Sequence, residues 1–275
     1  MKWIRRGVVL VLFMVMSGSG ILCAERFFKL MDEEKQFGML ADKVEENRSV
    51  EGQDVSQKTK KEGGAADTTH SAAESANEQT ISAFLPEYEK LFLENPDFAG
   101  WVSIDDTRIN YPVMQTLAEK EYYLHRNFEK ENSYAGTPFV GTGDLKKESG
   151  DLFVYGHNMK LGTMFSDLLK YRRQGFWEKH PVIHLDTLTE RREYEIFAAI
   201  EATEADWNQP DGLFNRFLYG QTQDQEKLMT ALEKRGLYDT AFSSEKGKQL
   251  LFLVTCSYQN REGRFVVAAV RVEEP

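Results

Sequence analysis

The apolar residues near the C-terminus predict two buried strands joined by a polar turn. Leu250–Val254 and Phe265–Val270 are short and rich in branched residues, which is typical of buried strands rather than helices. Ser257–Gly263 between them is polar and ends in glycine, so the pair is predicted to form a β-hairpin. If the turn closes symmetrically, Cys256 and Arg264 lie opposite each other on one face of the sheet.

Apolar runs and alternating patterns predict further strands upstream of this hairpin. They are Gly100–Ile104, Ile109–Met114, Thr137–Gly141, Asp151–Tyr155, Val182–Asp186 and Arg192–Ala202. In the last of these, Tyr194, Ile196, Ala198 and Ile200 are predicted to share one face. Seven or eight short strands with a few helices predict a mainly β domain of the α+β class. The expected architecture is a closed or nearly closed β-barrel with peripheral helices.

Four segments of the same region have helical spacing or helix-end signals. They are Phe84–Glu94, Glu119–Asn127, Thr163–Arg173 and Gln223–Arg235. Thr163 is the expected N-cap of the third segment, and Gly236 is the expected stop of the fourth. The fourth segment lies within Thr203–Ser243, which has no strand character. We therefore expect a helix-bearing insertion before the last two strands.

The N-terminus has the pattern of a membrane-targeting segment. Lys2, Arg5 and Arg6 precede an apolar run from Val8 to Cys23 that has no clear cleavage site. We interpret residues 1–24 as an uncleaved anchor in the cell membrane, with a cytoplasmic N-terminus and the remainder of the chain extracellular. A cleaved signal peptide is the alternative, because the apolar run is short for a membrane span.

Between this segment and the strands, the pattern predicts a helix and then a linker. Glu25–Val50 has roughly helical spacing of its apolar residues and is interpreted as a juxtamembrane helix. Glu51–Thr80 has almost no large apolar residues and is predicted to be a flexible stalk. The expected organisation is therefore an anchor at 1–24, a helix and stalk at 25–80, and a folded domain at 81–275.

Charge and composition exclude some functions. The formal net charge of −10 argues against nucleic acid as a partner. The histidines and cysteines are not spaced as metal ligands are, so the sequence implies neither a metal nor another cofactor.

One cysteine is a candidate for chemistry. Cys256 is the only cysteine beyond the apolar N-terminal segment and so has no disulfide partner in that part of the chain. The alternative is that it is a small core hydrophobe. A nucleophilic thiol needs a base or a cationic partner nearby. His157, just past a predicted strand, is the favoured histidine, and hairpin geometry favours Arg264 over the mid-turn Arg261.

These motifs together resemble those of the sortase family. Leu253–Cys256 followed by Arg264 resembles the sortase active-site signature, and Tyr155–Met159 resembles the family's histidine motif. The resemblance extends from Phe84 to Val272 and is nearest to class B sortases. The segments similar to that class are Gly100–Val102, Ile109–Val113, Tyr122–Leu124 and Gly162–Phe165, together with the insertion before the last two strands.

The resemblance implies a sortase-type closed β-barrel and a cysteine transpeptidase. Cys256 would attack a threonine carbonyl in the C-terminal sorting signal of an exported protein and form a thioacyl enzyme. His157 would act as acid and base, and Arg264 would hold the substrate or the oxyanion. An amine of a peptidoglycan precursor or a pilin would then resolve the intermediate.

Two further residues are implied as substrate contacts. Thr255 matches the family's threonine before the cysteine and is a candidate helper at the oxyanion, and Leu124 is a candidate pocket residue. The family often has an earlier threonine in this motif, which is missing from Leu251–Cys256. The asparagine-rich stretch expected before Tyr122 is also absent. These departures leave the substrate contacts open.

Two other functions fit the same residues. An exported cysteine protease would share the nucleophile and would hydrolyse the thioacyl intermediate instead of transferring it. A catalytically silent, wall-associated binding module would keep the fold alone. The combination of Cys256, His157 and Arg264 favours an enzyme over that module.

Overall fold

A computed structural model of the chain describes residues 24–25, 27–49, 83–148, 150–219, 225–240, 247–257 and 263–272. The chain divides into two compact units, Met1–Met39 and Leu40–Pro275. Residues 27–49 are helical, in agreement with the helix predicted over Glu25–Val50. The predicted stalk lies outside the described residues.

The predicted membrane localisation is corrected by the structure. Residues 1–23, where we placed most of the anchor, lie outside the described residues. In the part of the chain that is described, none of the helices has the length and apolar character needed to cross a membrane. The helix at 27–49 carries charged side chains such as Asp32, Glu33 and Lys35, which an apolar span excludes. This finding contradicts the prediction of a single-pass membrane protein.

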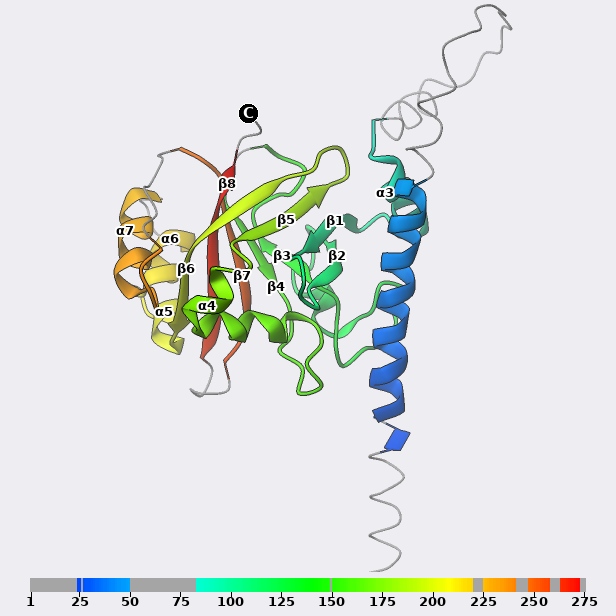
Figure 1. The fold of residues 1–275 in the computed structure, drawn as a ribbon, viewed down its shortest axis with the longest axis horizontal. Coiled ribbons are helices and arrows are strands. Elements are labelled where there is room, and N and C mark those ends of the chain that lie inside the picture. The colour runs from blue at the N-terminus through cyan, green and yellow to red at the C-terminus, as the bar shows by residue number, and fades with distance from the viewer. Residues whose placement is uncertain are drawn as a thin grey trace, which may run out of the picture. The chain divides into compact units, whose positions relative to one another are not determined.

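Eight strands close into a barrel (Figure 1), which confirms the predicted architecture and the upper strand count. Around the barrel the order is β1-β2-β3-β4-β7-β8-β6-β5. The bounds are β1 (Phe98–Ser103), β2 (Asn110–Met114), β3 (Phe139–Thr142), β4 (Leu152–Tyr155), β5 (Val182–Thr187), β6 (Glu193–Ala202), β7 (Leu250–Cys256) and β8 (Arg264–Val272).

The pairing of β4 with β7 is parallel and joins segments that are far apart in the sequence. Phe153 pairs with Phe252, and Tyr155 pairs with Val254. Parallel neighbours require a long crossover, which the chain between β4 and β7 provides. Because parallel strands end at the same edge, the loop after β4 and the end of β7 lie together.

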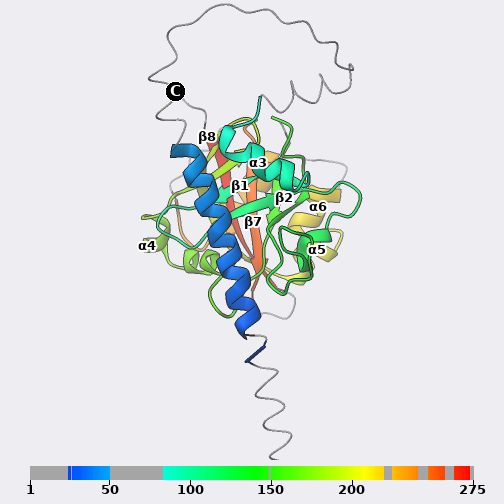
Figure 2. The ribbon, with the colours of Figure 1, turned by 90° about the vertical axis from the view of Figure 1, so that its right-hand side faces the viewer.

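Short helices surround the barrel. They are α3 (Pro86–Glu94), η1 (Tyr122–His125), η2 (Phe165–Arg172), α4 (Gln174–Trp177), α5 (Glu204–Asn208), α6 (Leu213–Tyr219) and α7 (Gln225–Arg235), where η marks 3₁₀ helices. α3 lies beside β1 (Figure 2), where Tyr88 packs against Phe98 and Trp101. The predicted N-cap role of Thr163 is wrong, because Met164 occupies that position with a positive φ of 56°.

A bulge in β6 overturns the prediction that four of its residues share one face. Ile196 pairs with Ala269, whereas Ala198 pairs with Ala268, and the register shifts between them. Neighbouring residues of β8 point to opposite faces, so Ile196 and Ala198 do too. Phe197 is the extra residue of the bulge. The sequence alternation alone did not reveal this inserted residue.

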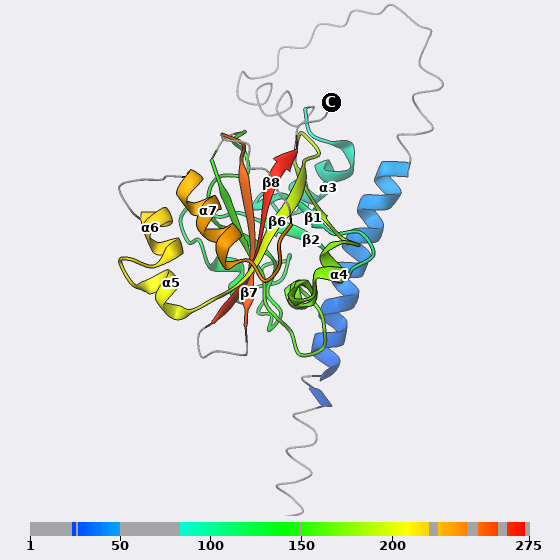
Figure 3. The same ribbon diagram turned by 60° about the vertical axis from the view of Figure 1, so that its left-hand side comes forward.

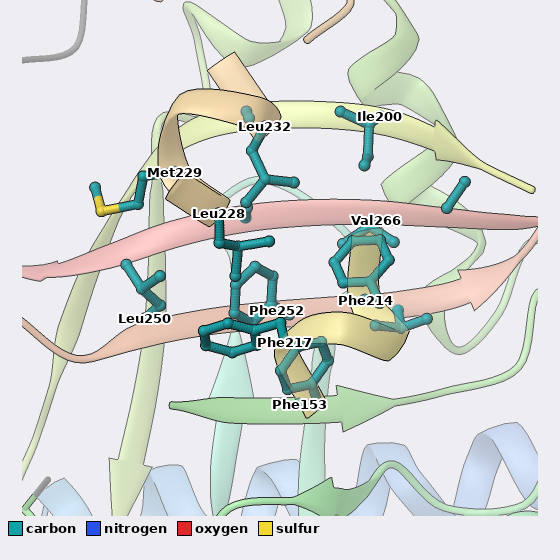
Figure 4. Packing of buried hydrophobic residues seen from close by; sticks show 14 of the residues in the cluster. Phe153, Ile200, Phe214, Phe217, Leu228, Met229, Leu232, Leu250, Phe252 and Val266 are labelled. Carbon is teal, nitrogen blue, oxygen red and sulfur yellow. The ribbon is translucent and has the colours of Figure 1, made fainter. Parts of the chain in front are cut away.

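The helices of the insertion, α5, α6 and α7, lie outside the barrel beside β6, β7 and β8 (Figure 3). Between them and the strands lies a continuous apolar cluster (Figure 4), called the insertion cluster below. Its members include Phe153, Trp207, Phe214, Phe217, Leu228, Met229, Leu232, Leu250, Phe252, Val254, Val266 and Ala268. The rings of Phe153 and Phe252 stack at 4.2 Å, directly across the β4–β7 pairing. The insertion cluster includes Phe153 of β4 and extends along β7 to Val254, near the end of that strand.

Gly100 provides a test of the barrel packing. It pairs with Thr187 of β5, and a Cβ atom at this position would overlap the backbone oxygen of Asp186. We expect Gly100→Ala to lower the free energy of unfolding by roughly 1–3 kcal/mol, measured by chemical denaturation. Gly175→Ala is the control, because the nearest atom to its Cβ would be a side-chain oxygen 4.0 Å away. Equal effects of the two substitutions would contradict the packing argument.

Candidate active site

The last two strands bring the predicted thiol and guanidinium residues together. Cys256 at the end of β7 pairs with Arg264 at the start of β8, and Val254 pairs with Val266. This confirms the predicted register. Val254 and Val266 belong to the insertion cluster, so the alternation of the strands puts Cys256 and Arg264 on that face. Cys256 is exposed, so its interpretation as a small core residue is wrong.

The loop after β4, which carries His157, is fastened to the end of β7 by backbone and side-chain hydrogen bonds. The Gly156 amide donates to the Val254 carbonyl at 3.1 Å. The buried Thr255 hydroxyl donates to the Gly156 carbonyl at 2.7 Å. Alternation directs Thr255 to the face opposite Cys256. Thr255 therefore holds the two strand ends together in this structure.

Asn158 completes this connection and was not among the site residues predicted from the sequence. Its side-chain amide donates to the Cys256 carbonyl at 3.0 Å, although 98 positions separate the two residues. Asn158 is buried, with 5% of its surface exposed. The residue that follows His157 is thus bonded to the backbone of the cysteine. Only its place beside His157 in the motif could have drawn attention to it.

The His157 imidazole is held by η1. Its Nε2 lies 2.8 Å from the Leu124 carbonyl oxygen, and because a carbonyl only accepts, Nε2 must carry the proton. The His125 ring stacks on that of His157, with centroids 5.5 Å apart and planes at 25°. Burial lowers the pKa of His157, and the nearby His125 charge lowers it further, against the raising effect of the Leu124 carbonyl. The neutral imidazole is therefore favoured.

Arg264 is flanked by aromatic rings. Its guanidinium carbon lies 4.9 Å from the centre of the Trp207 ring and 5.9 Å from that of Tyr155. Within the described residues, no hydrogen bond joins the Cys256 thiol to His157 or to Arg264. Arg261 and the rest of the hairpin turn, 258–262, lie outside those residues. Trp207 belongs to the insertion, and no pattern in the sequence indicated that it would meet Arg264.

A second set of polar contacts, formed by Ser257, Glu201 and Arg172, supports the end of β7. The Ser257 hydroxyl donates to Glu201 at 2.6 Å, and Glu201 also accepts from Arg172 of η2 at 2.6 Å. Arg172 donates to the Ser257 hydroxyl as well, at 3.3 Å. Ser257 directly follows Cys256 and is buried. The backbone on both sides of the cysteine is thus fixed by side-chain hydrogen bonds.

This arrangement is suited to nucleophilic chemistry by a thiol. An exposed cysteine lies across from an arginine, on a strand whose end is bonded to a histidine-bearing loop. Across the described ranges, no group of three or more histidine, cysteine or acidic side chains is arranged to hold a metal ion. An exposed thiol with a base and a cation nearby is able to carry out acyl transfer through sulfur.

Comparisons with known proteins show the family to which the chain is similar. The model of the sortase domain matches residues 102–272. Sortase B of Listeria monocytogenes is 31% identical over 176 residues, which are 63% of this chain and 69% of that protein. Sortase B of Staphylococcus aureus is 28% identical over 187 residues, 67% of this chain and 74% of that protein.

The solved structures to which this chain is similar are also class B sortases. The X-ray structure of Clostridium perfringens sortase B superposes with a TM-score of 0.59 at 28% identity, covering 67% of this chain and 99% of that one. A Staphylococcus aureus sortase B–substrate complex gives a TM-score of 0.61 at 26% identity, covering 74% and 98%. The fold and the site define a cysteine transpeptidase, and the chain belongs to the sortase family. The relatives named above are class B sortases. This similarity supports a cysteine transpeptidase that serves cell-wall anchoring.

The Asn158 bond leads to a first test of the site. Asn158→Ala should lower kcat/KM roughly tenfold, because the histidine loop loses its bond to the Cys256 carbonyl. The control is Gln225→Ala, which removes a side-chain amide bond of 2.8 Å to the Lys248 carbonyl, just before the other end of β7. Steady-state kinetics and thermal unfolding of both variants check this. A similar loss of activity in the control would contradict a specific role for Asn158.

The lowered pKa of His157 leads to a second test. The folded chain binds a proton at His157 more weakly than the unfolded chain, in which the pKa of histidine is near 6.5. The associated stability is therefore fully present above 6.5 and is lost as the pH falls below it. The unfolding temperature should fall between about pH 7.5 and about pH 5.5, and less so in His157→Gln. If the fall in unfolding temperature is reduced equally in His184→Gln, the effect is not specific to His157.

Proposed function

We propose that this class B sortase acts on exported proteins that carry a C-terminal sorting signal. Cys256 attacks a threonine carbonyl of that signal, and an amine of a peptidoglycan precursor or a pilin accepts the acyl group. The observation that carries the proposal is the pairing of exposed Cys256 with Arg264, beside a loop that presents His157. A sortase B of the same fold has been solved in complex with a substrate.

The proposed proton transfers follow from the state of His157. The neutral imidazole takes the thiol proton as sulfur attacks, and it returns that proton to the leaving amine when the C–N bond breaks. Nδ1 is the nitrogen for this role, because Nε2 is bonded to the Leu124 carbonyl. The incoming amine then attacks the thioester, and its departing proton restores the thiol.

Arg264 is proposed to stabilise the oxyanion that forms at the attacked carbonyl. It lies opposite the thiol residue, and its side chain carries a permanent positive charge. Such donors act best where charge develops in the transition state. Substrate contacts by Thr255 and Leu124 remain predictions. In the structure the Thr255 hydroxyl donates to the Gly156 carbonyl, and the Leu124 carbonyl is bonded to His157.

Product analysis with the purified full chain and candidate sorting peptides tests this function. With an added amine, mass spectrometry should find the transfer product, and Cys256→Ala should form no acyl-enzyme. His157→Ala should lose activity by a factor on the order of 10² or more, and Arg264→Ala by roughly 10²–10³. Arg264→Lys should also lose much activity, because an ammonium lacks the planar fork.

Three outcomes would contradict the proposal. Hydrolysis that an added amine does not divert would identify the enzyme as a protease. An acyl-enzyme trapped in Cys256→Ala would exclude that nucleophile. A severe loss in the control Arg261→Ala, beside a mild loss in Arg264→Ala, would transfer the role to the other arginine.

A further inference from the structure

Within the described part of the chain, Arg264 is held by aromatic faces and by no acceptor group. Its guanidinium carbon lies 4.9 Å from the Trp207 ring centre and 5.9 Å from the Tyr155 ring centre. The two rings are themselves 6.3 Å apart, with planes tilted by 58°. Among the residues that the structure describes, no oxygen accepts a hydrogen bond from this guanidinium, and no carboxylate forms an ion pair with it.

Arg172 shows the contrasting arrangement. Its guanidinium also lies over a ring, that of Phe265 at 5.3 Å, but it donates to Glu201 and Ser257 as well. A carboxylate partner takes up N–H donors and offsets the positive charge. An aromatic face attracts the cation while leaving its N–H donors unused. Among the contacts that the structure describes, Arg264 is the one of these two arginines that keeps its donors available.

The Trp207 ring is held in place by packing against other aromatic rings. It lies on α5 with 7% of its surface exposed, and its ring stacks on Phe214 of α6 at 4.3 Å and 13°. Phe153 of β4 meets it edge-on at 6.3 Å. The ring presented to Arg264 is thus part of the insertion cluster. It cannot turn without disturbing the packing of that cluster.

The turn of helix that carries Trp207 is anchored by its neighbour Asp206. Thr203 and Asp206 form a capping box at the start of α5. The two terminal guanidinium nitrogens of Arg235, from α7, donate to Asp206 at 2.5 and 2.9 Å. Burial disfavours the Asp206 charge, but the bonds from Arg235 and Thr203 prevail and lower its pKa to about 2. A continuous set of contacts therefore runs from α7 through α5 to the face of Trp207.

We propose that Trp207 is a positioning residue that orients Arg264 for catalysis. The inference rests on the role proposed for Arg264 above. In this view the insertion does more than cover the outer face of β7 and β8, because it supplies the surface on which the arginine lies. Its helices determine the direction of the free N–H donors at the attacked carbonyl.

The alternative is that Trp207 only fills the insertion cluster. Phe217 allows the two roles to be separated, because it belongs to the same cluster and contacts Phe153 and Phe252 at 6.4 Å. Within the described part, its ring has no cation contact with Arg264. A purely structural loss should appear equally in variants of both residues.

The experiment measures kcat and KM of the full chain on a sorting peptide, together with thermal unfolding. Trp207→Leu should lower kcat roughly tenfold, the scale of a partly buried cation–π contact, with a smaller effect on KM. Trp207→Phe, which keeps a ring face, should retain most of the activity. Phe217→Leu should lower the unfolding temperature while kcat stays within about twofold of wild type.

The decisive measurement is a double-mutant cycle. In the Arg264→Ala background, Trp207→Leu should cause no further loss of kcat. If Trp207→Leu does not fold, Arg235→Gln replaces it, since loosening α5 should lower kcat in the wild type and leave the Arg264→Ala rate unchanged. An equal loss in both backgrounds would overturn the inference. Wild-type turnover in Arg264→Ala would instead refute the proposed function. If Arg264→Ala loses turnover severely while Trp207→Leu stays fully active, only the inference about Trp207 is refuted.

Discussion

The parallel pairing of β4 with β7 is the contact on which the site depends. It aligns the carboxyl ends of two strands from distant parts of the chain, so the histidine loop and the cysteine meet at one edge of the barrel. Three hydrogen bonds then join the loop to the strand end, through Gly156, Thr255 and Asn158. Backbone pairing fixes the approach, and these bonds limit how far the two segments can separate.

Burial gives the histidine and the arginine different environments. The His157 ring lies against η1, where loss of solvent and the neighbouring His125 favour its neutral form. The Arg264 side chain lies against two aromatic rings and keeps its donors unpaired among the described residues. In the proposed mechanism, these environments suit His157 to accept a proton and Arg264 to bind negative charge. Both side chains are held by contacts with neighbouring residues, His157 by Leu124 and His125, and Arg264 by Trp207 and Tyr155.

The insertion links packing to chemistry. Its helices bury an apolar face that the outside of β7 and β8 would otherwise expose to water. At the edge of that face, Trp207 changes from a core residue to a neighbour of the site. Under the role proposed for Trp207, stability and catalysis depend on the same side chains in this part of the molecule.

The sequence alone determined the features that are local. Alternation and a symmetric turn set the register of Cys256 with Arg264, and short apolar runs predicted most of the strands of a closed barrel. The tertiary structure decided what local pattern cannot encode. The meeting of His157 with the end of β7 follows from a long parallel crossover, and the bulge at Phe197 inverts the faces of β6. Trp207 meets Arg264 only because separate helices pack on one sheet face, and no periodicity within a segment records such a contact.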